Sequence, residues 1–189
     1  MKILREKVAT GAMHNSGERF DPPKCHPGTR TALQDDVSRW VDEPPGGQLV
    51  TWLFGPAGAG KSAIAQTISE KLHTEGKLTA SFFFSRRESP SKGRGDESAL
   101  IATLAYQLSQ NAPATEPVIA RTVLKNPLIF NLSLDDQVQA LIVHPLMVVH
   151  QENAQYHCPR VVVVDGLDEC RKADNAHITE KADPLSSQI

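Results

Sequence analysis

Cysteine is scarce in this sequence. Its 189 residues include only Cys25, Cys158 and Cys170, an odd number whose spacing does not match a zinc site. His157 could join Cys158 and Cys170 in a partial zinc site, but we prefer ordinary packing or surface roles for these side chains. The sequence therefore predicts a reducing compartment and argues against a disulfide framework.

Long apolar runs and an excess of either charge are also missing. No stretch approaches the ~18 apolar residues of a membrane-spanning helix, and residues 1–15 lack the apolar centre of a signal peptide. The 20 Lys and Arg residues nearly balance the 22 Asp and Glu residues, for a formal net charge of -2. We therefore expect a cytoplasmic protein that binds neither nucleic acid nor membranes, in which any anion-binding site is local.

The sequence does contain a regular alternation of strand-like and helix-like segments. Short apolar, β-rich runs predict buried strands at 48–54, 78–84 and 160–165. Apolar residues at helical spacing predict helices at 31–41, 62–75, 100–108 and 133–145, the last with Ser133 as its N-cap and kinked or ended by Pro145. Residues 116–132 predict a helix followed by a loop around Asn126 and Pro127. This order predicts an α/β domain whose parallel sheet is covered on both faces.

A glycine-rich segment, GPAGAGKS, follows the first predicted strand and opens the next predicted helix. Gly55, Gly60, Lys61 and Ser62 fit the pattern G-x-x-x-x-G-K-[ST], and Gly58 adds a third glycine to the loop. In such a loop the backbone N–H groups surround phosphates, the lysine neutralises the β- and γ-phosphates, and the serine hydroxyl binds Mg²⁺. The segment predicts a nucleotide-phosphate site, and the alternative is a glycine-rich turn with a surface lysine.

Acidic residues follow the third predicted strand. In VVVVDGLDEC, four valines place Asp165 at the carboxyl end of a buried strand, where open α/β sheets bind ligands. We expect Asp165 to hold Mg²⁺ through water, with Asp168 and Glu169 as catalytic candidates that orient or deprotonate an attacking water. The alternative is that these acids only cap the next helix.

The two motifs together resemble those of the NACHT group of signal-transducing P-loop NTPases, a part of the STAND class. Two further segments are similar to the nephrocystin-3-like NACHT proteins of fungi. They are NSGERFDPPKCHPGTRTAL, upstream of the first strand, and ASFFFSR, at the second strand. The resemblance covers most of residues 13–170. It implies a P-loop NTPase three-layer sandwich with a parallel sheet, Walker A and Walker B motifs, and ATP or ADP with Mg²⁺ as the bound cofactors.

The resemblance also implies roles for residues outside the two motifs. Gly28, Thr29 and Arg30 would lie against the adenine as a lid on the nucleotide, and the alternative is a proline-glycine turn that only starts a helix. Arg86 or Arg87, after the second strand, would sense phosphate, and the alternative is a solvated basic loop.

The resemblance further implies a strand that this sequence lacks. In the wider class a later strand, ending in a phosphate-sensing arginine, lies between the P-loop strand and the aspartate strand, and nothing after Cys170 fits it. We therefore divide the chain into a lead-in segment with a helix (1–45), a partial NACHT domain incomplete at its carboxyl-terminal end (46–170) and a polar tail (171–189). Because each buried unpaired backbone group costs about 1–3 kcal/mol, we expect a truncated chain, direct pairing of the two strands, or a partner that supplies the missing one.

The leading functional hypothesis is a Mg-dependent, ATP- or ADP-binding switch in signalling, of the innate-immunity or heterokaryon-incompatibility kind. We expect hydrolysis to be weak or absent. The expected partners are adenine nucleotide and either a second copy of the chain or full-length NACHT relatives. Two alternatives stay open: an ordinary P-loop NTPase or kinase, and a catalytically dead fragment or interaction module.

Overall fold

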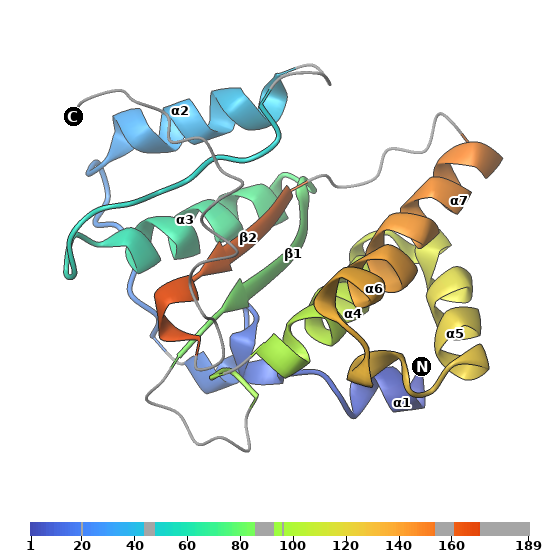
Figure 1. Ribbon diagram of the computed structural model, residues 1–189. Coiled ribbons are helices and arrows are strands. Elements are labelled where there is room, and N and C mark those ends of the chain that lie inside the picture. The colour runs from blue at the N-terminus through green and yellow to red at the C-terminus, as the bar shows by residue number, and fades with distance from the viewer. Residues whose placement is uncertain (20, 44–47, 86–92, 96, 154–160, 171–189) are drawn as a thin grey trace.

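Two parallel strands form the sheet in the part of the chain that the structure describes. The computed structural model describes residues 1–19, 21–43, 48–85, 93–95, 97–153 and 161–170. Strand β1 (Leu78–Phe83) pairs with β2 (Val161–Asp165), α3 (Lys61–Thr74) packs on one face, and α4 (Leu100–Asn111) packs against β1 on the other (Figure 1). The α/β class is therefore confirmed, while the three-layer P-loop sandwich requires more strands than these and stays a prediction.

Both strands follow from their apolar sequence. All six residues of β1 are buried, and β2 is built from four consecutive valines, as is typical of strands in a parallel sheet. The register pairs Phe83 with Asp165, and the Phe84 N–H continues the ladder by donating to the Asp165 carbonyl at 2.9 Å. The carboxyl ends of β1 and β2 consequently lie at the same edge of the sheet.

Residues 48–54 do not form the strand that their sequence predicts. They run as an irregular coil between α2 (Thr31–Asp42) and α3 (Figure 1), with Leu49 86% and Phe54 67% exposed. A strand needs a neighbour for its N–H and C=O groups, and within the described residues β2 pairs with β1 and nothing pairs with this segment. The predicted first strand is wrong, and so is its direct pairing with the aspartate strand.

The predicted helices are confirmed. α2 begins at Thr31, and α3 starts directly after the glycine-rich loop and is followed by Gly76 in the left-handed region, at φ 67°. The other α-helices are α1 (Lys2–Arg5), α4, α5 (Glu116–Lys125), α6 (Leu134–Val138) and α7 (His144–Glu152). Short 3₁₀ turns lie at Thr10–Ala12, Gly17–Arg19, Glu97–Ala99, Pro113–Thr115, Ile129–Asn131 and Leu167–Glu169.

Ser133 and Pro145 shape the last helical region. The Ser133 hydroxyl accepts a hydrogen bond from the Asp136 N–H at 3.1 Å, which makes it the N-cap of α6 as predicted. A π-helical turn (Gln139–Val143) joins α6 to α7, and Pro145 lies in the first turn of α7. Because proline has no N–H and its ring crowds the preceding turn, Pro145 deforms the helix at this point.

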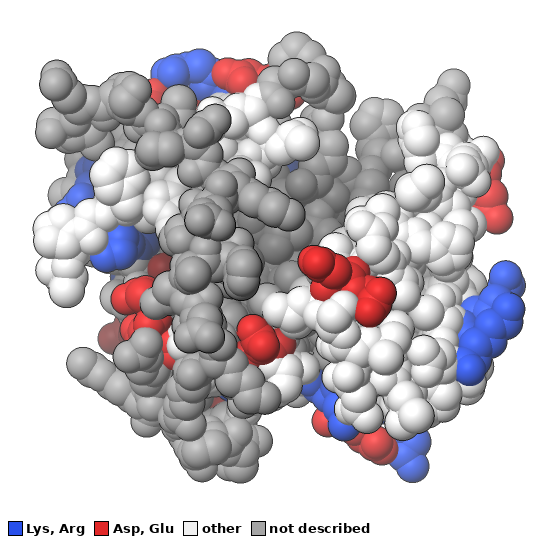
Figure 2. Space-filling model, viewed as in Figure 1, with Lys and Arg blue, Asp and Glu red and all other residues white. Residues whose placement is uncertain are grey.

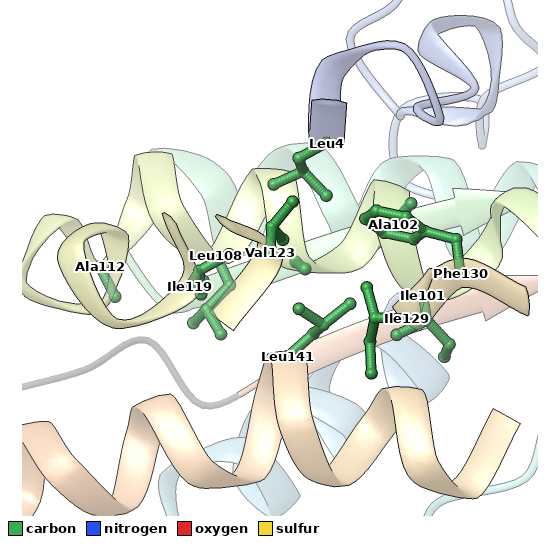
Figure 3. Packing of buried hydrophobic residues seen from close by; sticks show 11 residues of the cluster. Leu4, Ile101, Ala102, Leu108, Ala112, Ile119, Val123, Ile129, Phe130 and Leu141 are labelled. Atoms are coloured by element: carbon green, nitrogen blue, oxygen red, sulfur yellow. The ribbon is translucent and has the colours of Figure 1, made fainter. Parts of the chain in front are cut away.

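Separate apolar clusters hold the helices and the sheet together. The largest joins α1, α4, α5 and the π-helical turn (Figure 3), and its members are Leu4, Ile101, Ala102, Ala105, Leu108, Ala112, Ile119, Val123, Ile129, Phe130 and Leu141. A second cluster lies between α3 and the sheet and consists of Ile64, Ile68, Leu72, Leu78 and Val161, with part of α2 packed against it. The second cluster fixes α3 against the sheet.

The surface carries no broad basic area on the described part of the face seen in Figure 2. There the Lys and Arg side chains lie near the outline, and an uncharged area covers much of the helices on the right. Among the described residues, no helix has the length and apolar character needed to cross a membrane. The polar tail, residues 171–189, lies outside the described residues.

Candidate functional site

The glycine-rich loop, residues 55–60, leads directly into the first turn of α3. Gly58 has φ 78° and Gly60 has φ 88°, which are left-handed values that residues with a side chain rarely adopt. Gly60 is the N-cap of α3 and no side chain caps this helix end, while residues 55–58 are exposed. The loop therefore presents backbone N–H groups and the positive end of the helix dipole to solvent.

Lys61 folds back over this loop. Its Nζ donates hydrogen bonds to the Gly55 carbonyl at 3.0 Å and to the Pro56 carbonyl at 3.2 Å. These bonds hold the ammonium group across the loop opening, where phosphate oxygens can take the place of the carbonyl oxygens. The Lys61 ammonium group therefore lies at the glycine-rich loop, as the sequence predicts.

Ser62 and Asp165 come from distant parts of the sequence and meet beside the loop. The Ser62 hydroxyl lies beside the Asp165 carboxylate, which stands at the end of β2. Burial is the largest influence on this carboxyl and raises its pKa above the ordinary value; the Ser62 hydroxyl and the charge of Arg19 oppose the shift without cancelling it. The two predicted Mg²⁺ ligands therefore lie within contact of each other.

The other predicted acids lie in the 3₁₀ turn after β2. Gly166 makes the turn possible with φ 72°, and its carbonyl accepts from the Glu169 N–H at 2.8 Å. The charge of Glu169 raises the pKa of Asp165, which places the two carboxylates near one another, and Asp168 is exposed beside them. The structure brings these acids to the site; their action on water stays a prediction.

The segment Gly28–Arg30 forms a turn that also reaches the loop. The Thr29 N–H and hydroxyl both donate to the His26 carbonyl, at 3.0 and 2.7 Å, and Arg30 is the left-handed N-cap of α2 at φ 55°. The Arg30 guanidinium lies only 3.4 Å from the position that a Cβ on Gly60 would take. The segment is thus a helix-starting turn in contact with the site, and a role against adenine stays a prediction.

An apolar cavity of about 780 Å³ adjoins the loop. One side is the coil at 49–54, the other is β2, and residues of α2 and α3 close it. Lys61, Asp165 and Asp168 stand at its polar end. The exposed side of β2 and the coil at 49–54 border the same space. The sequence predicts that both segments are strands, but only β2 is one.

The oxygen ligands at this site suit Mg²⁺. Magnesium prefers one or two protein oxygens and completes its shell with water and phosphate oxygens, and Ser62 with Asp165 supplies such a pair. The described residues contain no group of three or more His, Cys, Asp or Glu that could hold a metal by themselves. Cys25 and Cys170 carry free thiols, and His157 and Cys158 lie outside the described residues.

The predicted phosphate-sensing arginines are untested, and a different arginine lies near the site. Arg86 and Arg87 lie outside the described residues, so their role in sensing phosphate stays a prediction. Arg19, which the sequence gives no reason to single out, lies near Asp165. A lone arginine in a polar segment carries no motif, and only the folded chain reveals its position.

Comparison with known proteins gives one result for most of the chain. The family model described as Nephrocystin 3, N-terminal, matches residues 28–188, which include the glycine-rich loop and the acidic motif but not Arg19. The comparisons with curated proteins and with solved structures found no match.

Proposed function

Because the chain belongs to the nephrocystin 3 N-terminal family, we propose that it is a Mg-dependent module that binds ATP or ADP. The glycine-rich loop holds the phosphates, Lys61 neutralises them, and Ser62 with Asp165 holds Mg²⁺. The similarity to NACHT proteins of the STAND class motivates adenine as the base and a signalling switch as the biological role.

The observation that carries this proposal is that Ser62, at the start of α3, lies beside Asp165, at the end of β2. An ordinary glycine-rich turn with a surface lysine does not require an aspartate at the end of a neighbouring strand. Here the lysine, the hydroxyl and the carboxylate surround one exposed loop at a helix N-terminus. This combination supports phosphate binding far better than the alternative of an ordinary turn.

The residues of the site have separate tasks in this proposal. Lys61 exchanges its bonds to the Gly55 and Pro56 carbonyls for bonds to phosphate oxygens, and the loop N–H groups donate to the same phosphates. A bound Mg²⁺ supplies charge neutralisation between the β- and γ-phosphates. Asp168 and Glu169 orient or deprotonate water, but the loop and Asp168 are open to solvent, which weakens electrostatic catalysis, so we expect slow hydrolysis or none.

A thermal melt with and without Mg-ADP tests the proposal. Ligand at 100 times its Kd adds about 2.7 kcal/mol, which raises the Tm of a domain of this size by several degrees. Lys61→Ala removes the ammonium group from the loop and should abolish most of that rise. Lys125→Ala, at the exposed end of α5, removes a charge of the same kind away from the site and should leave the rise unchanged.

Two results would count against nucleotide binding at this loop. One is a cooperative melt that Mg-ADP does not move, and the other is an equal rise in the wild-type and Lys61→Ala chains. Transfer of phosphate from ATP to an added acceptor would leave binding intact but would favour an ordinary P-loop kinase over a binding switch.

Association with another NACHT chain is a second candidate function. The exposed coil at 49–54 and the exposed Val162, at 45%, border one apolar cavity and offer apolar surface to a partner. Sedimentation over a wide concentration range tests self-association. A sedimentation coefficient that does not change with concentration, for the chain alone and with nucleotide, would remove a second copy as the partner.

A further inference from the structure

Arg19 is held in one position by two contacts that come from different elements. Its guanidinium carbon lies 3.7 Å from the centre of the Phe83 ring, and its NH1 donates to the Gln66 Oε1 at 2.7 Å. Gln66 is fully buried, and its Nε2 donates to the His14 carbonyl at 2.9 Å and to the Glu70 Oε1 at 2.8 Å. A planar cation fixed at its face and its edge loses little further freedom when it meets an anion.

Both contacts place Arg19 next to the proposed Mg²⁺ ligands. Phe83 is the register partner of Asp165, so the ring under the guanidinium is the neighbour of that carboxylate on the sheet. Gln66 follows Ser62 by one helical turn on the same face of α3. The charge of Arg19 also lies near enough to Asp165 to favour the ionised carboxylate.

We propose that Arg19 is a built-in counter-cation for Asp165, a positioning residue that makes nucleotide binding less dependent on Mg²⁺. The proposal rests on the proposed function, since it assigns Arg19 to the same phosphate and metal site. It goes beyond the family match, because Arg19 precedes the matched residues 28–188.

The expected effect follows from the signs of the charges. Arg19 neutralises Asp165 when no metal is present and attracts phosphate oxygens, so it supports the binding of nucleotide alone. When Mg²⁺ binds, Arg19 repels the metal and competes with it for the Asp165 carboxylate. Mg²⁺ therefore increases the affinity for nucleotide less than it would in a chain without Arg19. The quantity to measure is therefore the ratio of the nucleotide Kd in EDTA to the Kd in Mg²⁺.

The first experiment measures this ratio with ADP by calorimetry or fluorescence titration. Arg19→Gln and Arg19→Met both remove the charge, and the methionine keeps an apolar side chain on the Phe83 ring. Both variants should raise the ratio of the two Kd values about fivefold or more. Arg19→Lys keeps the charge and should stay near the wild type. Lys125→Gln is the control, because it removes an exposed positive charge at the end of α5, away from the site, and its ratio should not change.

The second experiment needs no nucleotide. The free energies of unfolding of the wild type, Arg19→Gln, Asp165→Asn and the double variant form a double-mutant cycle. The loss of Arg19 should cost less stability when residue 165 is asparagine, because the charge pair is then absent. Additive effects would overturn the pairing, and this conclusion would stand whether or not the chain binds nucleotide.

The two experiments separate the two possible failures. If the wild type binds no ADP in either buffer, the proposed function fails and the ligand role of Arg19 fails with it, while the cycle still decides the pairing with Asp165. If the wild type binds ADP but the neutral Arg19 variants change the two Kd values equally, Arg19 is only a packing residue and the inference is overturned.

Discussion

Ser62 lies in the first turn of α3 beside Asp165, the last residue of β2, and its hydroxyl favours the ionised form of that carboxylate. This proximity connects the glycine-rich loop to the sheet even though residues 48–54, which precede the loop, make no strand. Ile64 and Ile68 of α3 also share one apolar cluster with Val161, at the other end of β2, which holds the helix on the sheet. The site is therefore positioned by the helix that follows the loop.

Replacing Asp165 with asparagine should stabilise the nucleotide-free chain at neutral pH and remove the Mg²⁺-dependent part of nucleotide binding. The pKa of Asp165 is raised by burial, so the folded chain is penalised for keeping this carboxyl ionised once the pH exceeds its folded pKa. The penalty disappears as the pH falls below about 3.8, the pKa of this carboxyl in the unfolded chain. The gain in Tm should therefore be largest at neutral pH and should shrink on acidification.

Asp135→Asn is the control for this stability gain. Asp135 is exposed in the first turn of α6, where its charge favours the helix dipole, so its replacement should give a small loss or no change. A lower Tm for Asp165→Asn at neutral pH would show that the carboxylate stabilises the fold and would contradict the prediction.

Replacing Gly166 with alanine should destabilise the chain by roughly 2 kcal/mol, the cost of a left-handed conformation plus a close contact. Gly166 has φ 72°, and a Cβ there would lie 3.1 Å from the Phe84 carbonyl oxygen. Chemical denaturation measures the change in unfolding free energy. Gly17→Ala is the matched control, since a Cβ on Gly17 meets nothing within 4 Å, and equal stabilities of the two variants would refute the argument.

Much of this fold follows from local sequence patterns. Ile64, Ile68 and Leu72 recur at helical spacing and form the buried face of α3, and the run Val161–Val164 gives β2. These elements depend mainly on their own periodicity and on burial. The sequence therefore predicts them correctly, including the meeting of the loop and Asp165 at one edge.

The coil at 48–54 shows where local patterns are insufficient. Its apolar, β-rich residues satisfy the rules for a buried strand, but a strand exists only when a neighbour accepts its hydrogen bonds. The same limit applies to Arg19, because its position depends on contacts with Phe83 and Gln66, which are far away in sequence. Tertiary neighbours decide both outcomes.

His14 should make the chain lose stability as the pH falls from 6.5 to 4. Burial, followed by the charges of His73 and Arg19, lowers the pKa of His14 from 6.5 to about 4, outweighing the opposite effect of Glu70. As the pH falls, the His14 side chain therefore binds a proton in the unfolded chain before it does so in the folded chain. The free energy of unfolding is unaffected by His14 above pH 6.5, declines between pH 6.5 and pH 4, and does not change further below pH 4. The total loss is roughly 2 to 3 kcal/mol.

Denaturant titrations across this pH range test the role of His14. His14→Asn keeps a polar atom that can bond to the Ser81 hydroxyl, which lies 3.0 Å from the Nδ1 of His14, and should flatten the decline. His150→Asn, at an exposed position in α7, should leave it unchanged. An equally steep decline in the His14→Asn chain would assign the acid sensitivity to other groups.

Replacing Gly60 with alanine should weaken nucleotide binding by more than its effect on stability explains. Gly60 has φ 88°, so the substitution strains the loop, and the new Cβ would lie in contact with the Arg30 guanidinium, 3.4 Å away. Gly76→Ala is the control, because Gly76 is also left-handed, at φ 67°, but has open space and lies at the other end of α3. Both variants should lose about 1–2 kcal/mol of stability.

Only Gly60→Ala should raise the Kd for Mg-ADP, by roughly tenfold or more, if loop N–H groups bind phosphate. Equal Kd values for the two variants would mean that nucleotide does not contact this loop.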